Sequence, residues 1–541
     1  MTTYDVGPGP DHQPVATASK AGKGRTFAMV GGLGAGLLVL GGGALAATMF
    51  FNQGEQPAEA LPADTIAYAS IDLDPSGGQK LEIINTLRKF PAFTEATDLD
   101  ADSDIMKELF DEAMASGECG DLDYAADVEP WIGARAAFAV VDAGQEQPSP
   151  VAVVHATDSG KAEAGVDALI QACGGESDDL GVTLSGDWIV LAESQEITDT
   201  VARASEDGAL ADDEDFKRWT GEAGGEAIVS AYVSQRVADH ADQLAELAES
   251  TSSTSVTSPE MAELGTALET DPASSEALRA ALKDFKGAAI ALRFNDGGLE
   301  LEAAGGLPEQ AEAVSVEAGA ELVAGLPEET IAALGVGLSD GWLGQISKQL
   351  DESELADESL EEMLAEMDLT VQDVEQGLGE GIALALGGGL DVDAVVNGGP
   401  EDLPAGVVVK ASADDVNALI GKVDDFGVSQ GEESLLAAYP WLQAEGSDGV
   451  AVLSPHDGYR AALNAPDATL GESAEYESVV DDDAHGVFFV NFNADDNWLV
   501  RLSESEGNDE MVENAEPLAA FGVSWWVDGD VSHAKVRLTT D

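Results

Sequence analysis

Few residues in this 541-residue chain combine the types and spacing that site chemistry requires. Four aspartates alternate along the segment DLDADSD, as at the start of a calcium-binding loop: Asp98, Asp100, Asp102 and Asp104. A complete loop needs glycine at its sixth position and a carboxylate at its twelfth, where this chain has Ser103 and Leu109. The aspartates are therefore candidates for a weaker calcium site, and a polar connector that caps a helix is the competing interpretation. The segment DDDAH, residues 481–485, is a second and weaker candidate.

The segment GLSDG, residues 337–341, matches the G-x-S-x-G pattern of a hydrolase nucleophile. It lies between an expected strand and an expected helix, which is the context that a nucleophile elbow needs. None of the six histidines has a spacing that identifies it as the matching base. We interpret Ser339 as a turn residue that caps a helix, and we predict no catalytic residues and no cofactor.

Cys119 and Cys173 are the only cysteines of the chain. If the chain is exported into an oxidising compartment, one disulfide between them is the simplest expectation. Two free buried thiols are the alternative, whereas a zinc site would need more ligands nearby.

The chain carries 104 acidic and 24 basic residues, which gives a net charge of −80. A surface of this sign repels the phosphate backbone of nucleic acids and the headgroups of anionic lipids. The sequence therefore excludes nucleic-acid binding as a main function. Three explanations of the acidity remain open: a solvated surface suited to high salt, cation binding at carboxylate clusters, or a basic partner.

One segment is long and apolar enough to cross a membrane. The run from Phe27 to Phe51 holds no charged residue and would span about 37 Å as a helix, against about 30 Å of hydrocarbon. Basic residues precede this run, and none follows it until Lys80. The positive-inside rule then predicts a cytoplasmic N-terminus and an extracytoplasmic chain after about residue 52.

These observations divide the N-terminal region into three parts. We expect a disordered cytoplasmic tail at 1–24, a transmembrane helix at 25–51 and a linker at 52–60. A cleaved signal peptide is the alternative, because Ala44–Ala46 fits a small-residue cleavage site.

The remaining chain contains a long internal repeat. LPADTIAYASIDLDP, residues 61–75, returns as LPEETIAALGVGLSD, residues 326–340. Further pairs follow in the same order along both halves: 127–140 with 373–386, 150–170 with 405–423, 187–204 with 449–465, 226–244 with 485–502, and 286–306 with 519–540. The order predicts two tandem homologous domains, at 61–305 and 326–541, with a connector at 306–325. A Ser/Thr-rich loop at about 248–271 accounts for most of the extra length of the first domain.

Within each repeat, short apolar runs alternate with segments of helical periodicity. TIAYASIDL, AAFAVV and WIVLAE are typical of strands, and AEAGVDALIQA after Asp158 is typical of a capped helix. Asp-Gly pairs in FNDGGLELEA and WVDGDVSHAKV predict hairpin turns. The expected fold class is α+β, with mainly antiparallel sheet and packed helices after one N-terminal transmembrane helix.

Two stretches of the first repeat carry a family resemblance. LPADTIAYASIDLDPSGGQKLEIINTLRKFPAF and CGDLDYAADVEPWIGARAAFAV resemble DUF3352, membrane-anchored actinobacterial proteins of unknown function. The shared features are a D-P-S-G-x-Q stretch after the first strand and a P-W-[IL]-G motif before the next. In the second repeat Pro130-Trp131 is replaced by Gly377-Leu378. The resemblance implies a membrane-anchored topology and supports the fold, and it brings no catalytic residues.

From the sequence we expect a single-pass, membrane-anchored, exported protein that is not an enzyme. Its expected role is a binding or scaffolding module at the cell envelope, with another envelope protein as the partner. A carrier of an apolar or lipid ligand is the first alternative, and an envelope hydrolase is the second. The sequence leaves open the ligand, the oligomeric state and the reason for the acidity.

Overall fold

The computed structural model describes residues 56–73, 77–96, 105–115, 122–145, 147–173, 180–225, 227–240, 282, 285–295, 297–306, 313–314, 316–352, 359–390 and 399–541. The predicted tail, transmembrane helix and Ser/Thr-rich loop lie outside these residues. Among the helices that are described, none has the length and apolar character needed to cross a membrane.

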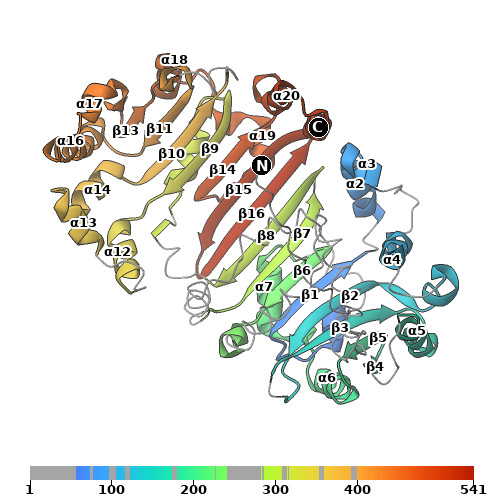
Figure 1. Cartoon of the computed structure of the whole chain (residues 1–541). Helices are drawn as coiled ribbons and strands as arrows, with labels where there is room; N and C mark the ends of the chain where they lie inside the picture. The colour runs from blue at the N-terminus through green and yellow to red at the C-terminus, as the bar shows by residue number, and fades with distance from the viewer. Residues whose placement is uncertain are drawn as a thin grey trace, which may run out of the picture.

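Within the described residues, sixteen strands form one antiparallel sheet (Figure 1). Its strand order is β12-β13-β11-β10-β9-β14-β15-β16-β8-β7-β6-β1-β2-β3-β5-β4. The strands are β1 (Ala67–Asp72), β2 (Ile132–Val141), β3 (Ser149–Ala156), β4 (Gly181–Ser185), β5 (Trp188–Ala192), β6 (Val229–Val233), β7 (Ala288–Asn295), β8 (Gly298–Gly306), β9 (Thr330–Gly337), β10 (Gly381–Gly387), β11 (Ala405–Val409), β12 (Glu445–Ser447), β13 (Val450–Leu453), β14 (Gly486–Asn491), β15 (Leu518–Asp528) and β16 (Val531–Thr540).

Each half of the chain contributes eight neighbouring strands in the same relative order. Read inward from the sheet edges, the first half gives β4-β5-β3-β2-β1-β6-β7-β8 and the second gives β12-β13-β11-β10-β9-β14-β15-β16. The last strands of the two halves, β8 and β16, pair antiparallel along their length. The chain is therefore α+β with a large antiparallel sheet, and the sheet is continuous where a boundary between domains is predicted.

Both predicted Asp-Gly hairpins are confirmed. Asn295 pairs with Gly298 at the turn between β7 and β8, and Asp528 pairs with Val531 between β15 and β16. Gly529 has a φ of 61° in the second turn, a left-handed conformation that glycine adopts without a steric penalty. These two hairpins supply the four strands at the middle of the sheet.

The helices lie mostly toward the two ends of the sheet, and a few pack on its middle strands (Figure 1). They are α2 (Gly77–Leu87), α3 (Pro91–Ala96), α4 (Ile105–Ala115), α5 (Ser159–Ala172), α6 (Gln195–Asp207), α7 (Glu214–Glu222), α11 (Ala318–Ala324), α12 (Trp342–Glu352), α13 (Leu360–Glu366), α14 (Val371–Leu378), α16 (Ala413–Ser429), α17 (Leu435–Ala438), α18 (Asp457–Asn464), α19 (Ala474–Val479), α20 (Ala494–Glu506) and α21 (Asp509–Ala515). The predicted cap of α5 is confirmed, since the Asp158 side chain accepts a hydrogen bond from the backbone N–H of Gly160.

Alternating strand residues pack into cores on opposite faces of the sheet. On one face, which we call the covered face, α6 and α7 pack on the first half and α11, α18 and α19 on the second. The other face is covered near the ends of the strand order, by α4 and α5 over β3 and β5 and by α16 over β11 and β13. In the first half, Val153 belongs to the covered face and Ala152 to the other.

Candidate functional site

Most residues singled out from the sequence are not brought together. The four alternating aspartates and Cys119 lie outside the described residues, so the calcium site and the disulfide stay predictions. Cys173 is buried at the C-terminal end of α5. In the part of the chain that the structure describes, no group of three or more His, Cys, Asp and Glu side chains could hold a metal ion.

Ser339 lies between β9 and α12, which is the strand–turn–helix context expected of it. Its hydroxyl donates a hydrogen bond to the backbone carbonyl of Ala313, with an Oγ–O distance of 3.2 Å. The Ser339 carbonyl accepts a bond from the N–H of Trp342 at the start of α12. The side chain thus holds two backbone segments together.

The P-W-I-G motif serves packing. Trp131 is 4% exposed, and its indole N–H donates to the carbonyl of Asp127 at 2.7 Å. Gly165 of α5 lies against the indole ring, because a Cβ atom there would come within 2.0 Å of Trp131 Nε1. The motif therefore packs α5 against the sheet. This structural role accounts for Trp131 and for the facing Gly165, and it requires no catalytic or binding function.

An apolar cavity of about 100 Å³ lies next to this tryptophan, between the sheet and helices α4 and α5. Its lining includes Ile71, Met106, Trp131, Val166 and Leu191. For comparison, a cavity of about 150 Å³ is known to hold one benzene molecule. As the structure stands, this cavity is too small for a lipid chain.

An extended apolar feature lies in the middle of the sheet, on the side opposite the covered face. One row of cross-strand partners runs over seven strands and contains only apolar side chains: Leu384, Leu334, Phe488, Val523, Val536, Leu301 and Leu292. A second row beside it is equally apolar: Leu386, Ala332, Val490, Phe521, Leu538, Leu299 and Phe294. We call these two rows the apolar face.

The apolar face is open at several of its residues. Leu384 is 48% exposed and Phe488 is 37% exposed, and Ile290 beside the first row is 43% exposed. At the β7 end the face is covered, because α2 packs over Phe294. In Figure 1 the strands β14, β15, β16 and β8 are seen along most of their length between the helices at the two ends.

The size of the apolar face fits a binding surface. Strand spacings of about 4.8 Å and about 3.4 Å per residue give the two rows a footprint on the order of 400 Å², which includes the covered residues Leu292 and Phe294. Patches of this size often mark binding sites.

Sequence reasoning missed this surface, although the sequence contains a signal for it. A half-solvated antiparallel strand usually alternates apolar and polar residues. The segments TIAALGVG (β9), GIALALG (β10) and GVFFVN (β14) are apolar on both sides instead. On each strand, the apolar residues of one side belong to the core of the covered face. The apolar residues of the other side belong to the apolar face.

A network of buried charges lies on the covered face, where β7, β8 and β16 meet. Arg293 Nη1 is 3.0 Å from Glu300 Oε1 and 2.8 Å from Glu302 Oε2. Arg537 Nε is 3.3 Å from Glu300 Oε2, and Lys535 Nζ is 3.6 Å from Glu302 Oε1. Arg293, Glu300 and Glu302 are each less than 10% exposed, so their charges must be compensated locally. The network ties the two halves of the chain together.

Lys535 extends the network to Asp481, with an Nζ–Oδ2 distance of 2.8 Å. Burial acts to raise the pKa of Asp481, but the hydrogen bond and charge of Lys535 outweigh burial and hold that pKa below its usual range. Burial likewise acts to lower the pKa of Lys535, and the Asp481 and Glu302 carboxylates raise it overall. Both groups are therefore charged at neutral pH.

These features describe an α+β protein with one extended antiparallel sheet, a covered face, and an open apolar face at its centre. The chain belongs to the DUF3352 family, proteins of unknown function, whose family model matches residues 30–378. No curated protein and no solved structure matches the chain.

Proposed function

We propose that this protein is a non-enzymatic binding module whose binding surface is the apolar face. The observation that carries the proposal is the unbroken run of apolar partners across seven strands, with Leu384 and Phe488 exposed within it. Leaving such a surface in water is unfavourable by about 25 cal/mol for each Å². A partner that covers it gains that free energy, which makes the surface a binding site.

The proposed partner is an amphipathic helix of another envelope protein, apolar on one side and basic on the other. The part of the apolar face from β10 to β8, outside the end that α2 covers, is about 24 Å long, which is the length of a helix of about 16 residues. The chain carries a net charge of −80, and α21 alone presents Asp509, Glu510 and Glu513 to solvent. A chain of this charge favours a basic partner and repels an acidic one.

Three synthetic peptides test this chemistry against the full chain by titration calorimetry. The first is a helix of about 16 residues with leucine on one side and lysine on the other. The second replaces lysine with glutamate, and the third replaces leucine with serine and keeps the lysines. We expect saturable one-to-one binding of the first peptide only. Equal binding of the first and third peptides would refute the proposal, because charge alone would then explain the affinity.

The topology forms part of the same proposal. Residues 25–51 would anchor the chain with a cytoplasmic N-terminus, and the described residues would lie outside the cytoplasm. The apolar stretch from Phe27 to Phe51 and the basic residues before it support this orientation. Protease added to intact spheroplasts should degrade the part after residue 52, and full protection of that part would contradict the topology.

We further propose that the two halves are tandem homologous domains, at 61–305 and 326–541. The eight-strand order common to both halves supports a duplication, as do the six matched sequence segments. The apolar face then lies across the junction of the two domains, since its first row passes from Val536 of β16 to Leu301 of β8.

Carriage of an apolar ligand is the remaining alternative, and it would use the same face, because the cavity beside Trp131 is small. Titration with a fatty acid below its micelle concentration distinguishes the two. Fatty-acid binding that displaces the leucine–lysine peptide would favour a carrier. An envelope hydrolase is less well supported, since the Ser339 hydroxyl donates to a backbone carbonyl.

A further inference from the structure

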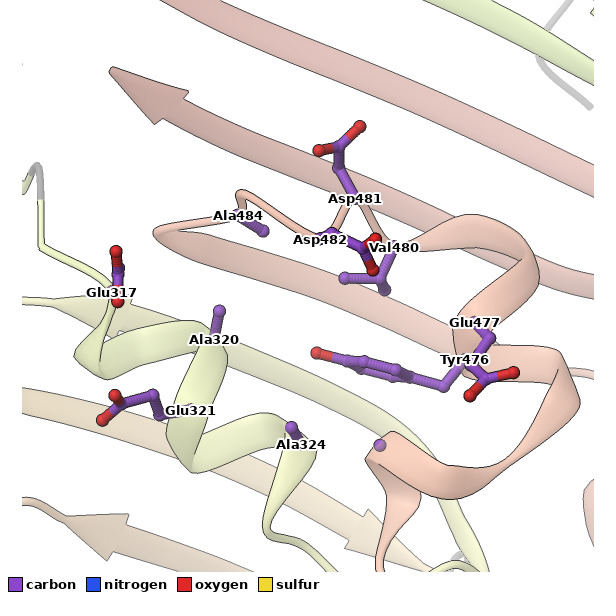
Figure 2. A pocket seen from close by; sticks show the side chains of 11 residues that line it. Glu317, Ala320, Glu321, Ala324, Tyr476, Glu477, Val480, Asp481, Asp482 and Ala484 are labelled. Carbon is purple, nitrogen blue, oxygen red and sulfur yellow. The ribbon is translucent and has the colours of Figure 1, made fainter. Parts of the chain in front are cut away.

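A pocket of about 290 Å³ opens on the covered face, between α11 and the segment from α19 to β14 (Figure 2). It is therefore separate from the apolar face. Five carboxylates line it: Glu317, Glu321, Glu477, Asp481 and Asp482. Ala320, Ala324, Val480 and Ala484 form an apolar strip between them.

Two of the five carboxylates are already paired. Glu321 lies 2.5 Å from Lys410 Nζ, and Asp481 lies 2.8 Å from Lys535 Nζ. Glu317, Glu477 and Asp482 have no ion-pair partner within the described part of the chain, and all three are exposed. The pocket therefore keeps three negative charges uncompensated, on both of the elements that form it.

A second feature of the pocket is the largely buried side chain of Tyr476. Its side chain is 7% exposed, and in Figure 2 its ring reaches from α19 toward α11, with the hydroxyl inside the pocket. The hydroxyl has no hydrogen-bond partner among the described residues. Burial raises the pKa of Tyr476, so the group stays a neutral phenol. No protein group in the described part of the chain satisfies this hydroxyl, so it is left to water or to a ligand in the pocket.

We propose that this pocket binds an aliphatic polyamine. Ammonium groups would pair with the carboxylates of Glu317, Glu477 and Asp482, and the methylene chain would lie on the apolar strip. A central amine would meet the hydroxyl of Tyr476, which accepts a hydrogen bond from an ammonium group. At about 30 Å³ for each water, the pocket holds about ten waters, and spermidine has about ten non-hydrogen atoms.

The arrangement favours an extended cation over a single metal ion. A calcium ion needs six to eight oxygens converging at about 2.3–2.6 Å. In Figure 2 the carboxylates stand around the rim, with Glu317 and Glu477 on opposite sides of the pocket. Charges separated by an apolar strip match a ligand whose charges are separated by methylenes.

Titration calorimetry of the full chain with spermidine, in about 0.15 M salt, tests the proposal. We expect one saturable site. Tyr476→Phe should weaken binding about three- to tenfold, because it removes one hydrogen bond and keeps the ring that packs at 5.4 Å from Phe489. The triple variant Glu317→Gln, Glu477→Gln, Asp482→Asn should weaken binding by at least about thirtyfold.

A matched triple variant on α21 controls for the general acidity of the surface. Asp509→Asn, Glu510→Gln and Glu513→Gln remove the same charge from exposed positions away from the pocket. We expect this variant to bind spermidine as the wild type does. Equal loss in both triple variants, no effect of Tyr476→Phe, or displacement of spermidine by an equal concentration of calcium would each overturn the proposal. None of these results depends on the apolar face.

Discussion

At the scale of single residues, the buried charges lie where the two halves of the sheet join, on β7, β8 and β16. Arg293 is enclosed by Glu300 and Glu302 and also donates to the carbonyl of Ala223 at the end of α7. The sequence shows alternating glutamates in GLELEA, which predict a strand with one polar side. The sequence could not show that this polar side is buried. Its charged partners lie on the neighbouring strand β7 and on β16, and β16 is more than 230 residues further along the chain.

Glu302→Gln tests the buried network. The variant leaves the Arg293 and Lys535 charges less compensated, so the free energy of unfolding should fall by about 3 kcal/mol. Glu321→Gln is the control, since it breaks an exposed pair with Lys410 and should cost less than about 1 kcal/mol. Denaturant unfolding measures both. Similar losses in the two variants would mean that burial does not strengthen the network.

At the scale of elements, local signals were strong enough to predict hairpins and caps. Asp-Gly pairs predicted both central hairpins, and Asp158 predicted the start of α5. The apolar face could not be predicted in this way, because cross-strand register decides which apolar residues adjoin. Leu334 and Phe488 are opposite each other although 154 positions separate them in the chain. Local periodicity carries no information about such pairs.

The capping box of α14 allows a test of a single element. The side chain of Thr370 accepts from the N–H of Asp373, and the Asp373 carboxylate accepts from the N–H of Thr370. Thr370→Ala should lower the free energy of unfolding by about 1 kcal/mol. Ser412→Ala is the matched comparison at the cap of α16, where the Ser412 side chain accepts from the N–H of Asp415, and we expect a loss of similar size. Denaturant unfolding measures both, and no loss in either variant would contradict the assigned caps.

Asp373 also gives this element a pH dependence. The hydrogen bond from Lys422, with further bonds from Thr370, lowers the pKa of Asp373 from 3.8 to about 2. Because the pKa of Asp373 is lower in the folded state than in the unfolded state, its carboxylate stabilises the fold at any pH above the unfolded-state pKa. This stabilisation is lost as the pH falls toward the folded-state pKa. We expect part of the stability to disappear between about pH 4 and pH 2, and less of it in Asp373→Asn. If the free energy of unfolding fell equally with acid in the wild type and in Asp373→Asn, the proposed role of Asp373 would be contradicted.

At the scale of the whole molecule, the repeated sequence predicted the order of the elements but not the joining of the halves. The matched sequence segments indicate that the two halves have the same fold. They do not indicate that β8 and β16 pair edge to edge, since an unpaired edge and a paired one have similar sequences. The pairing places the apolar face and the charged network on opposite sides of one junction.

The net charge of −80 is a second property of the whole molecule. Like charges repel more strongly in the compact fold, and salt screens them over a Debye length of about 10 Å at 0.1 M and about 3 Å at 1 M. We therefore expect the melting temperature to rise by several degrees between these concentrations of sodium chloride. Calorimetric melting curves measure the effect. An unchanged or lower melting temperature at 1 M would show that self-repulsion is not the main electrostatic cost.

The most direct test of the binding proposal is the affinity of the leucine–lysine peptide for variants of the apolar face. Leu384→Asp and Val428→Asp replace side chains of the same 48% exposure, the first on the apolar face and the second on α16. Each adds one negative charge, so any general attraction for a basic peptide changes equally. We predict at least about tenfold weaker binding in Leu384→Asp and wild-type binding in Val428→Asp. Equal affinities in the two variants would contradict the assignment of the apolar face as the binding surface.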